Sequence, residues 1–443
     1  MNQPSDFYLG ERGARAASLG GDDAGRPPLL EDISAAVDEL AVAFWPVNKT
    51  IHDNPELAYE EHHAHHVLTR FMAAQDGWRV TRSAYGIDTA WVAVYDSGRR
   101  GPVVSFNAEM DALPGIGHAC GHNLIASASV LGAAATATVM KKHKLCGKIV
   151  LFGTPAEEGG GGKIRLLNAG AYSSQGVDVS LISHPGIVPD AARMHTTALS
   201  SFQAEYFGRE AHAAANPWLG INALDGLVTA YASLSMLRQQ CMPGDVIQGH
   251  ITDGGLRPNI IHAHAAGRFV VRADSQARLG RLRRKVYACF EAGATASGAR
   301  LSITEGEAYR DHVANGPLAR SYTRYFNALG PRHPIAENVE EDVRRGRTQA
   351  STDQGDVSYA MPSLSPAFAI APAGEEGGGQ GPHNPEFAAA AGTRDAFARA
   401  AMVGKGLAGV AVDLLTVEGF LDEVKRSWRE DMERLGVGSD ESL

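Results

Sequence analysis

Two imidazoles and one thiol alternate along a glycine-containing segment, in which residues 118–123 read His-Ala-Cys-Gly-His-Asn. Successive side chains of an extended backbone point to opposite sides, so His118, Cys120 and His122 would face the same side. Two carboxylates lie shortly upstream, and imidazole, thiolate and carboxylate are the ligands that transition metals take. The spacing therefore predicts a metal-binding loop. By itself it leaves all three side chains as candidate ligands of one ion.

The composition limits the kinds of partner that we expect. The chain has 443 residues, of which 44% are hydrophobic and 21% charged, and its net charge is −9. Because it has no long basic run, we expect it to bind neither nucleic acid nor an anionic membrane surface. We also expect no membrane-spanning segment and, because residues 1–28 carry no apolar signal core, a cytoplasmic protein. The four cysteines lie far apart, which favours a reducing compartment over a disulfide framework.

Strands and helices alternate in most of the chain, which predicts an α/β fold with a mostly parallel central sheet. From about residue 198 the pattern changes to two strands that are each followed by a helix, which predicts an inserted α+β domain. The predicted division is a tail, a first part of the main domain, the insertion, a second part of the main domain and a second tail: residues 1–28, 29–197, 198–304, 305–430 and 431–443.

Polar residues follow two of the predicted buried strands. Glu157 and Glu158 come directly after the strand at 148–153 and precede four glycines, and His184 ends the next strand. Loops at the carboxyl ends of parallel strands are where α/β proteins bind ligands. An isolated Glu-Glu pair is most often a solvated turn, but its place after a buried strand favours a cation-binding or catalytic pair. For His184, a structural and a ligating role remain about equally plausible.

Other candidates carry less information on their own. His212 is flanked by small residues, which is as consistent with a packed loop as with close approach of a ligand. Asn259 lies in a turn with free polar groups, and His383 follows a glycine-rich loop at 374–381 that we expect beside the site. Residues 351–356 are either a capped turn or a substrate-contacting loop.

Several motifs together identify a family resemblance that no single motif would support. The chain resembles the aminoacylase and amidohydrolase branch of the metallopeptidases called family twenty, and most closely its cytosolic dipeptidase subgroup. The branch includes hydrolases of p-aminobenzoyl-glutamate and of N-acyl amino acids. The resemblance covers about residues 30–420 and rests on these segments, in this order: IHDNPEL, EMDALPGIGHACGHN, TPAEEGGGGK, SHPG, GREAHAAANPWLGINALD, RPNIIH, STDQGDVS and PHNPEF.

The resemblance implies a binuclear-metal exopeptidase-type catalytic domain with an inserted lid that commonly forms a homodimer interface. Two divalent metals, zinc or manganese, would be bound there. By motif, the implied metal ligands are Cys120, His122, Glu158, His184 and His383. Cys120 would lie between the two ions, and His118 would shape the loop instead of binding metal.

The resemblance also assigns roles beyond the ligands. Glu157 would be the general base, and Asp111 would support a ligand from behind. In the lid, His212 would reach the substrate carbonyl and Asn259 would help to hold the substrate. His262 departs from the family pattern, in which proline is usual, so substrate choice is expected to differ from that of the common dipeptidases.

The leading hypothesis is therefore a metallohydrolase that cleaves the amide bond of a dipeptide or an N-acyl amino acid. One alternative is a pathway-specific variant that hydrolyses or forms an amide of a secondary metabolite. The other alternative is a metal-bound binding protein without catalytic activity. Retention of the implied base and of all five implied ligands favours an enzyme.

Overall fold

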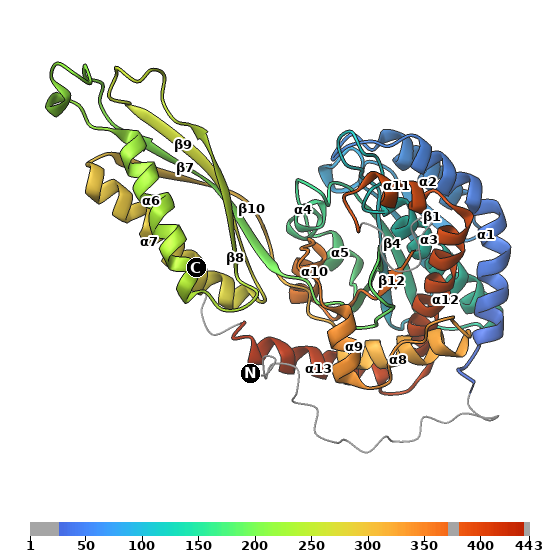
Figure 1. Ribbon diagram of the computed structural model, residues 1–443. Helices are drawn as coiled ribbons and strands as arrows, with labels where there is room; N and C mark the ends of the chain where they lie inside the picture. Colours follow the sequence, from blue (N-terminus) through green and yellow to red (C-terminus); the bar gives the residue numbers. More distant parts are fainter. Residues whose placement is uncertain (1–25, 371–380, 438–443) are drawn as a thin grey trace. The chain divides into compact units, whose positions relative to one another are not determined.

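The computed structural model describes residues 26–370 and 381–437, which divide into two compact units (Figure 1). The second unit comprises Thr196–His312 and Gln349–Asp356, and the remaining described residues form the first. The predicted insertion, 198–304, would end inside strand β10 (Arg300–Tyr309), which pairs with β7 (Ala198–Phe207) over most of its length. The unit therefore extends beyond that boundary. The predicted glycine-rich loop at 374–381 lies, except for Gly381, outside the described residues.

A six-stranded sheet forms the centre of the first unit, in the order β1-β2-β4-β3-β5-β11. The β3–β4, β3–β5 and β5–β11 pairs are parallel, whereas β1–β2 and β2–β4 are antiparallel. This confirms the predicted α/β fold with a mostly parallel sheet. The six strands are β1 (Trp78–Thr81), β2 (Trp91–Asp96), β3 (Val103–Glu109), β4 (Lys148–Thr154), β5 (Val179–Leu181) and β11 (Ser363–Leu364). A separate parallel pair joins β6 (His184–Gly186) to β12 (Ala367–Ala369).

Helices cover both faces of this sheet because its strands are apolar on both sides. Along β2, Trp91 and Ala93 belong to the core formed with α1, α3 and α12, whereas Val92 and Val94 pack toward α4 and α5. The helices of the first unit are α1 (Leu30–Asp53), α2 (His62–Ala73), α3 (His122–His143), α4 (Gly162–Asn168), α5 (Ala171–Gln175), α8 (Gly316–Ala328), α9 (Val339–Gly346), α11 (Pro385–Ala391), α12 (Arg394–Thr416) and α13 (Phe420–Arg434), with α10 (Gln354–Ala360) starting in the second unit. Because α13 continues to Arg434, the predicted tail at 431–443 begins inside a helix.

Helix α3 corrects the expectation that no stretch could span a membrane. By length and composition it qualifies, with 22 residues and a mean hydropathy of 1.5. However, 94% of the 18-residue apolar segment of this helix is buried inside the structure. Such burial is what the central helix of an α/β core requires. Helices α12 and α13 meet the same criterion only when they are joined across a bend of 107°.

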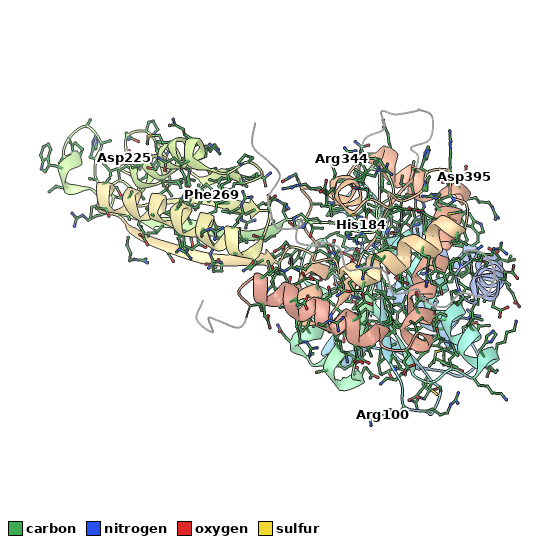
Figure 2. The ribbon with its side chains drawn as sticks, turned by 90° about the horizontal axis from the view of Figure 1, so that it is seen from below. Arg100, His184, Asp225, Phe269, Arg344 and Asp395 are labelled. Atoms are coloured by element: carbon green, nitrogen blue, oxygen red, sulfur yellow. The ribbon has the colours of Figure 1, made fainter. Side chains whose placement is uncertain are left out.

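The second unit is a four-stranded antiparallel sheet in the order β10-β7-β9-β8, with two long helices. Its core contains Phe269 (Figure 2), whose ring lies 4.8 Å from that of Phe290. The sequence predicted only the two inner strands, because both edge strands are mostly exposed and lack an apolar run. The elements are β7 (Ala198–Phe207), α6 (Ala223–Leu237), β8 (Val246–Asp253), β9 (His264–Ala273), α7 (Gln276–Ser297) and β10.

Backbone contact between two glycines fixes α3 against α12. A Cβ atom on Gly404 of α12 would lie 2.9 Å from the carbonyl oxygen of Ala128 and 3.4 Å from the amide nitrogen of Gly132, both in α3. Side chains at this crossing would force the helices apart. Because α3 begins at His122, the same packing holds the end of the predicted metal-binding loop.

We predict that Gly404→Ala destabilises the protein by about 1–3 kcal/mol, because the added methyl group has no space and backbone cannot give way cheaply. Gly280→Ala in α7 is the matched control, since a Cβ there meets nothing within 4 Å. That substitution should stabilise its helix by roughly 0.5–1 kcal/mol. Denaturant unfolding measures both, and equal effects of the two variants would contradict the predicted tight crossing.

Candidate metal centre

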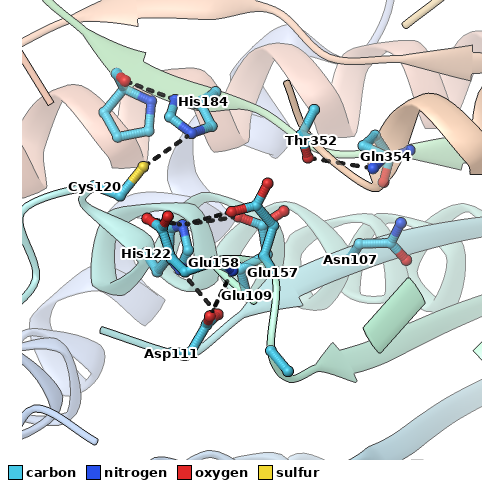
Figure 3. A network of polar contacts seen from close by, with 12 residues as sticks. Asn107, Glu109, Asp111, Cys120, His122, Glu157, Glu158, His184, Thr352 and Gln354 are labelled. Carbon is cyan, nitrogen blue, oxygen red and sulfur yellow. Dashed lines mark hydrogen bonds and ion pairs between the residues drawn. The ribbon is translucent and has the colours of Figure 1, made fainter. Parts of the chain in front are cut away.

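Several side chains of the first unit that could bind a metal follow the carboxyl ends of adjacent parallel strands. Glu109 is the last residue of β3, Glu157 and Glu158 follow β4, and His184 follows β5. Because β3 pairs in parallel with both β4 and β5, these ends meet at one edge of the sheet. The loop between β3 and α3 brings Cys120 and His122 to the same edge (Figure 3). This arrangement, here called the metal centre, comprises Glu109, Asp111, Cys120, His122, Glu157, Glu158, His184 and His383.

Two groups of potential ligands meet at one thiol. One group is Cys120, His122 and His184, and the other is Cys120, Glu158 and His383. Within each group the ligand atoms lie within 4.8 Å of one another. The Cys120 Sγ atom is 3.4 Å from His184 Nε2, and His383 Nε2 is 3.3 Å from Glu158 Oε2. The structure therefore brings together all five side chains that the resemblance implied, with Cys120 common to both groups.

Among the described residues, His118 belongs to none of the potential metal-binding groups. It is buried, its ring stacks near that of His52 with centroids 6.3 Å apart, and burial lowers its pKa to about 3. Alternation along the sequence made it as good a candidate as its neighbours. The backbone from His118 to Gly121 is a turn instead of an extended strand, and the Gly121 amide donates to the carbonyl oxygen of His118 at 3.1 Å, so alternation does not put the three side chains on one side.

Hydrogen bonds orient the rings of His122 and His184. The Nδ1 atom of His122 is 3.0 Å from Asp111 Oδ1, and the other Asp111 oxygen accepts a hydrogen bond of 2.8 Å from the Glu158 amide. The Nδ1 atom of His184 is 2.7 Å from the carbonyl oxygen of Pro185. With the proton on Nδ1 in each ring, Nε2 presents its lone pair to a cation.

The chemistry of these donors fits divalent cations. His122 Nε2 and Glu158 Oε1 are buried and have no hydrogen-bond partner among the described residues. Burial raises the pKa of the Cys120 thiol well above its usual range, and the nearby Glu158 carboxylate raises it further. A thiolate there consequently needs a cation.

Two residues of the centre have strained backbone conformations. Ala156, directly before the glutamate pair, has a φ of 58°, and His383 has a φ of 68°. Such a conformation costs a non-glycine residue about 1–3 kcal/mol and persists only where its surroundings enforce it. The Ala156 amide donates to Glu61 Oε1 at 2.8 Å, and the His383 amide donates to the carbonyl oxygen of Ala119 at 2.8 Å.

Sequence reasoning missed three residues at this site. Glu61 is fully buried and holds the Ala156 turn, but nothing in its sequence context distinguishes it from other helix-start glutamates. Glu109 groups with His122 and Glu157 as potential ligands. Lys163 is fully buried, with Nζ 2.6 Å from Glu109 Oε1. The sequence signal for the Glu109–Lys163 pair is a single lysine that directly follows four glycines.

The remaining predicted site residues belong to the second unit. The Ala213 amide donates to the carbonyl oxygen of Asn259 at 3.0 Å, which places His212 and Asn259 on adjoining segments. His212 Nδ1 accepts hydrogen bonds from the amides of Ala214 and Ala215, at 3.2 and 3.1 Å. The exposed ring therefore keeps its proton on Nε2, where it can be donated to a ligand. Their assignment to substrate binding remains a prediction.

Comparisons with known proteins agree with this geometry. The chain is 36% identical to the Xaa-Arg dipeptidase of Mus musculus over 429 residues, which is 94% of this chain and 96% of that protein. It is 26% identical to a p-aminobenzoyl-glutamate hydrolase polypeptide of Escherichia coli, over 76% of this chain and 73% of the relative.

Solved structures show the same fold. A putative aminohydrolase from methicillin resistant Staphylococcus aureus matches with a TM-score of 0.71 and 18% identity, over 87% of this chain and all of that one. A dinuclear metal binding M20 peptidase from Bacillus subtilis matches with a TM-score of 0.62 and 16% identity, over 85% of this chain and 99% of that one. Residues 105–394 match the family described as Peptidase family M20/M25/M40. The chain belongs to this family, in its amidohydrolase and dipeptidase branch, and is a metal-dependent peptidase or amide hydrolase.

Proposed function

We propose that the protein hydrolyses the amide bond of a dipeptide or an N-acyl amino acid at a centre of two divalent metals. The observation that carries this proposal is the pair of ligand groups that share Cys120, with Glu157 next to them. The relative with 36% identity is an Xaa-Arg dipeptidase, so dipeptides with a basic C-terminal residue are the first substrates to test.

In this proposal Glu157 is the general base. Its Oε2 atom lies 3.7 Å from His122 Nε2, and its carboxylate is almost fully buried. The two metals, when bound, polarise the scissile carbonyl and lower the pKa of a water molecule. Glu157 takes the proton of that water and passes it to the nitrogen of the leaving amine. Asp111 keeps His122 in the tautomer that leaves Nε2 available.

The second unit would complete the chemistry. We propose that His212 donates its Nε2 proton in a hydrogen bond to the carbonyl oxygen on which negative charge develops. The two amide hydrogen bonds that Nδ1 accepts support this role because they fix the tautomer. Asn259, on the adjoining segment, would bind the substrate carboxylate or amide. This step requires the second unit of the same or of a partner subunit to reach the substrate during turnover.

Glu157→Gln is expected to lower kcat by about 10²–10⁴ fold, because the amide cannot accept the proton of the attacking water. Two metal equivalents should remain bound, since Glu157 is not among the five implied ligands. Glu158→Gln is the matched comparison and should reduce the metal content, measured by elemental analysis. A Glu157→Gln enzyme with undiminished turnover would exclude Glu157 as the base.

Zinc and manganese are the proposed metals: the thiolate favours zinc, and the nitrogen and oxygen ligands suit either. Removal of metal with a chelator should abolish hydrolysis and lower Tm, because it leaves buried carboxylates without a counter-charge. Adding back zinc or manganese should restore both properties. Hydrolysis that persists in protein shown to be metal-free would disprove the metal requirement.

We also propose a homodimer formed through the second unit. Large hydrophobic side chains are exposed on α6, namely Val228, Tyr231 and Met236. The outer edge of β8 pairs with no other strand in the described part of the chain, and Ile251 on it is exposed. Apolar side chains and a free strand edge on one small unit are typical of a surface that a second copy covers.

The double substitution Tyr231→Asp and Met236→Asp should convert the dimer into a monomer, as measured by light scattering after size-exclusion chromatography. Charged side chains cannot be buried in an interface without partners. Val42→Asp in α1 is the control, because Val42 is equally apolar and exposed but belongs to the first unit. A monomeric wild-type protein, or a double variant that stays dimeric, would refute the proposed interface.

A further inference from the structure

A buried ion pair lies beside the implied metal ligands, and neither of its two residues has a role in the proposed function. Glu109 ends β3 and Lys163 is the second residue of α4, and both side chains are almost completely inaccessible to solvent. Lys163 Nζ is 2.6 Å from Glu109 Oε1. A fully buried lysine is unfavourable unless a carboxylate compensates its charge, so each residue requires the other.

The second oxygen of Glu109 faces an implied metal ligand. Glu109 Oε2 is 3.3 Å from His122 Nε2, whereas His122 Nδ1 is held by Asp111 at 3.0 Å. With Nδ1 donating to Asp111, the Nε2 lone pair and Glu109 Oε2 are two donors close enough to bind the same cation. The distance of 3.3 Å equals that between His383 Nε2 and Glu158 Oε2 in the other ligand group.

We infer that Glu109 is a further carboxylate that faces the metal bound by His122, and that Lys163 holds it in this position. The inference rests on the proposed binuclear metal site and extends it by two residues. Lys163 fixes one carboxylate oxygen, so the other cannot turn away from His122. Glu109 therefore strengthens metal binding, and Lys163 acts through Glu109 as a positioning residue.

The charges of the metal centre agree with this assignment. Its four carboxylates and the Cys120 thiolate carry five negative charges when ionised, and two divalent cations supply four positive charges. The ammonium group of Lys163 supplies the fifth. Lys163 thus offsets part of the negative charge next to Glu109, which lowers the cost of placing this carboxylate close to the others.

The test is zinc binding to the full-length protein, measured by competition with a chelating dye after all metal has been removed. In the double variant Glu109→Leu and Lys163→Met, apolar side chains replace the ion pair, which a fold often tolerates. We expect this variant to fold with a Tm close to that of the metal-free wild type. One of its two zinc-binding steps should weaken by about 10–100 fold, the range for residues that support metal ligands.

Single variants and a matched control separate metal binding from folding. Glu109→Gln keeps the side-chain shape and should weaken the same step, and Lys163→Met should do so because Glu109 loses its anchor. The control replaces another buried pair of the first unit, Arg193→Met with Asp342→Leu, whose side chains are 3.0 Å apart and belong to none of the potential metal-binding groups. Whatever its effect on Tm, this control should leave both zinc affinities unaltered.

The outcomes also separate this inference from the proposed function. Wild-type protein that binds no zinc or other divalent metal would disprove the binuclear site itself. Wild-type protein that binds two zinc ions, with both affinities preserved in the folded double variant and in Glu109→Gln, would overturn only the role of Glu109. Loss in Glu109→Gln with full affinity in Lys163→Met would overturn the anchoring role of Lys163.

Discussion

The metal centre depends on one buried carboxylate that joins two loops. Asp111 binds the ring of His122 with one oxygen and the amide of Glu158 with the other. His122 is the first residue of α3, directly after the loop that follows β3, and Glu158 comes from the loop after β4. Because a carboxylate is rigid, these two hydrogen bonds fix the distance between the loops. The tautomer of His122 and the position of Glu158 thus have a single cause.

The surrounding fold holds this concentration of negative charge at the edge of the central sheet, with Glu109, Asp111 and His122 almost fully buried. The carboxyl ends of strands β3, β4 and β5 lie at one edge of the sheet. The close crossing of α3 and α12 at Gly132 and Gly404 fixes the position at which α3 begins. The strained backbone conformations of Ala156 and His383 then set the direction of individual side chains in the centre. Such an arrangement opposes folding unless cations and Lys163 compensate the charge, so we expect metal binding and stability to be coupled in this protein.

Much of the architecture could be predicted, because buried parallel strands are continuous apolar runs and leave a strong signal. The strands that contain Phe106 and Leu151 were therefore predicted, as was the location of Glu157, Glu158 and His184 behind strand ends. The edge strands β8 and β10 were missed because they are mostly exposed and have no apolar run. The end of the inserted unit was misplaced for the same reason.

The sequence by itself determined which kinds of donor are present, in which order, and therefore the family and the class of reaction. It could not distinguish His118 from Cys120 and His122, because alternation predicts a shared side only for extended backbone and the segment from His118 to Gly121 is a turn. Nor could it pair Glu109 with Lys163, which are far apart along the chain and meet only after β3 and α4 have packed. Ligand types are local properties of the sequence, whereas distances between ligands are set by long-range packing, which only the tertiary structure decides.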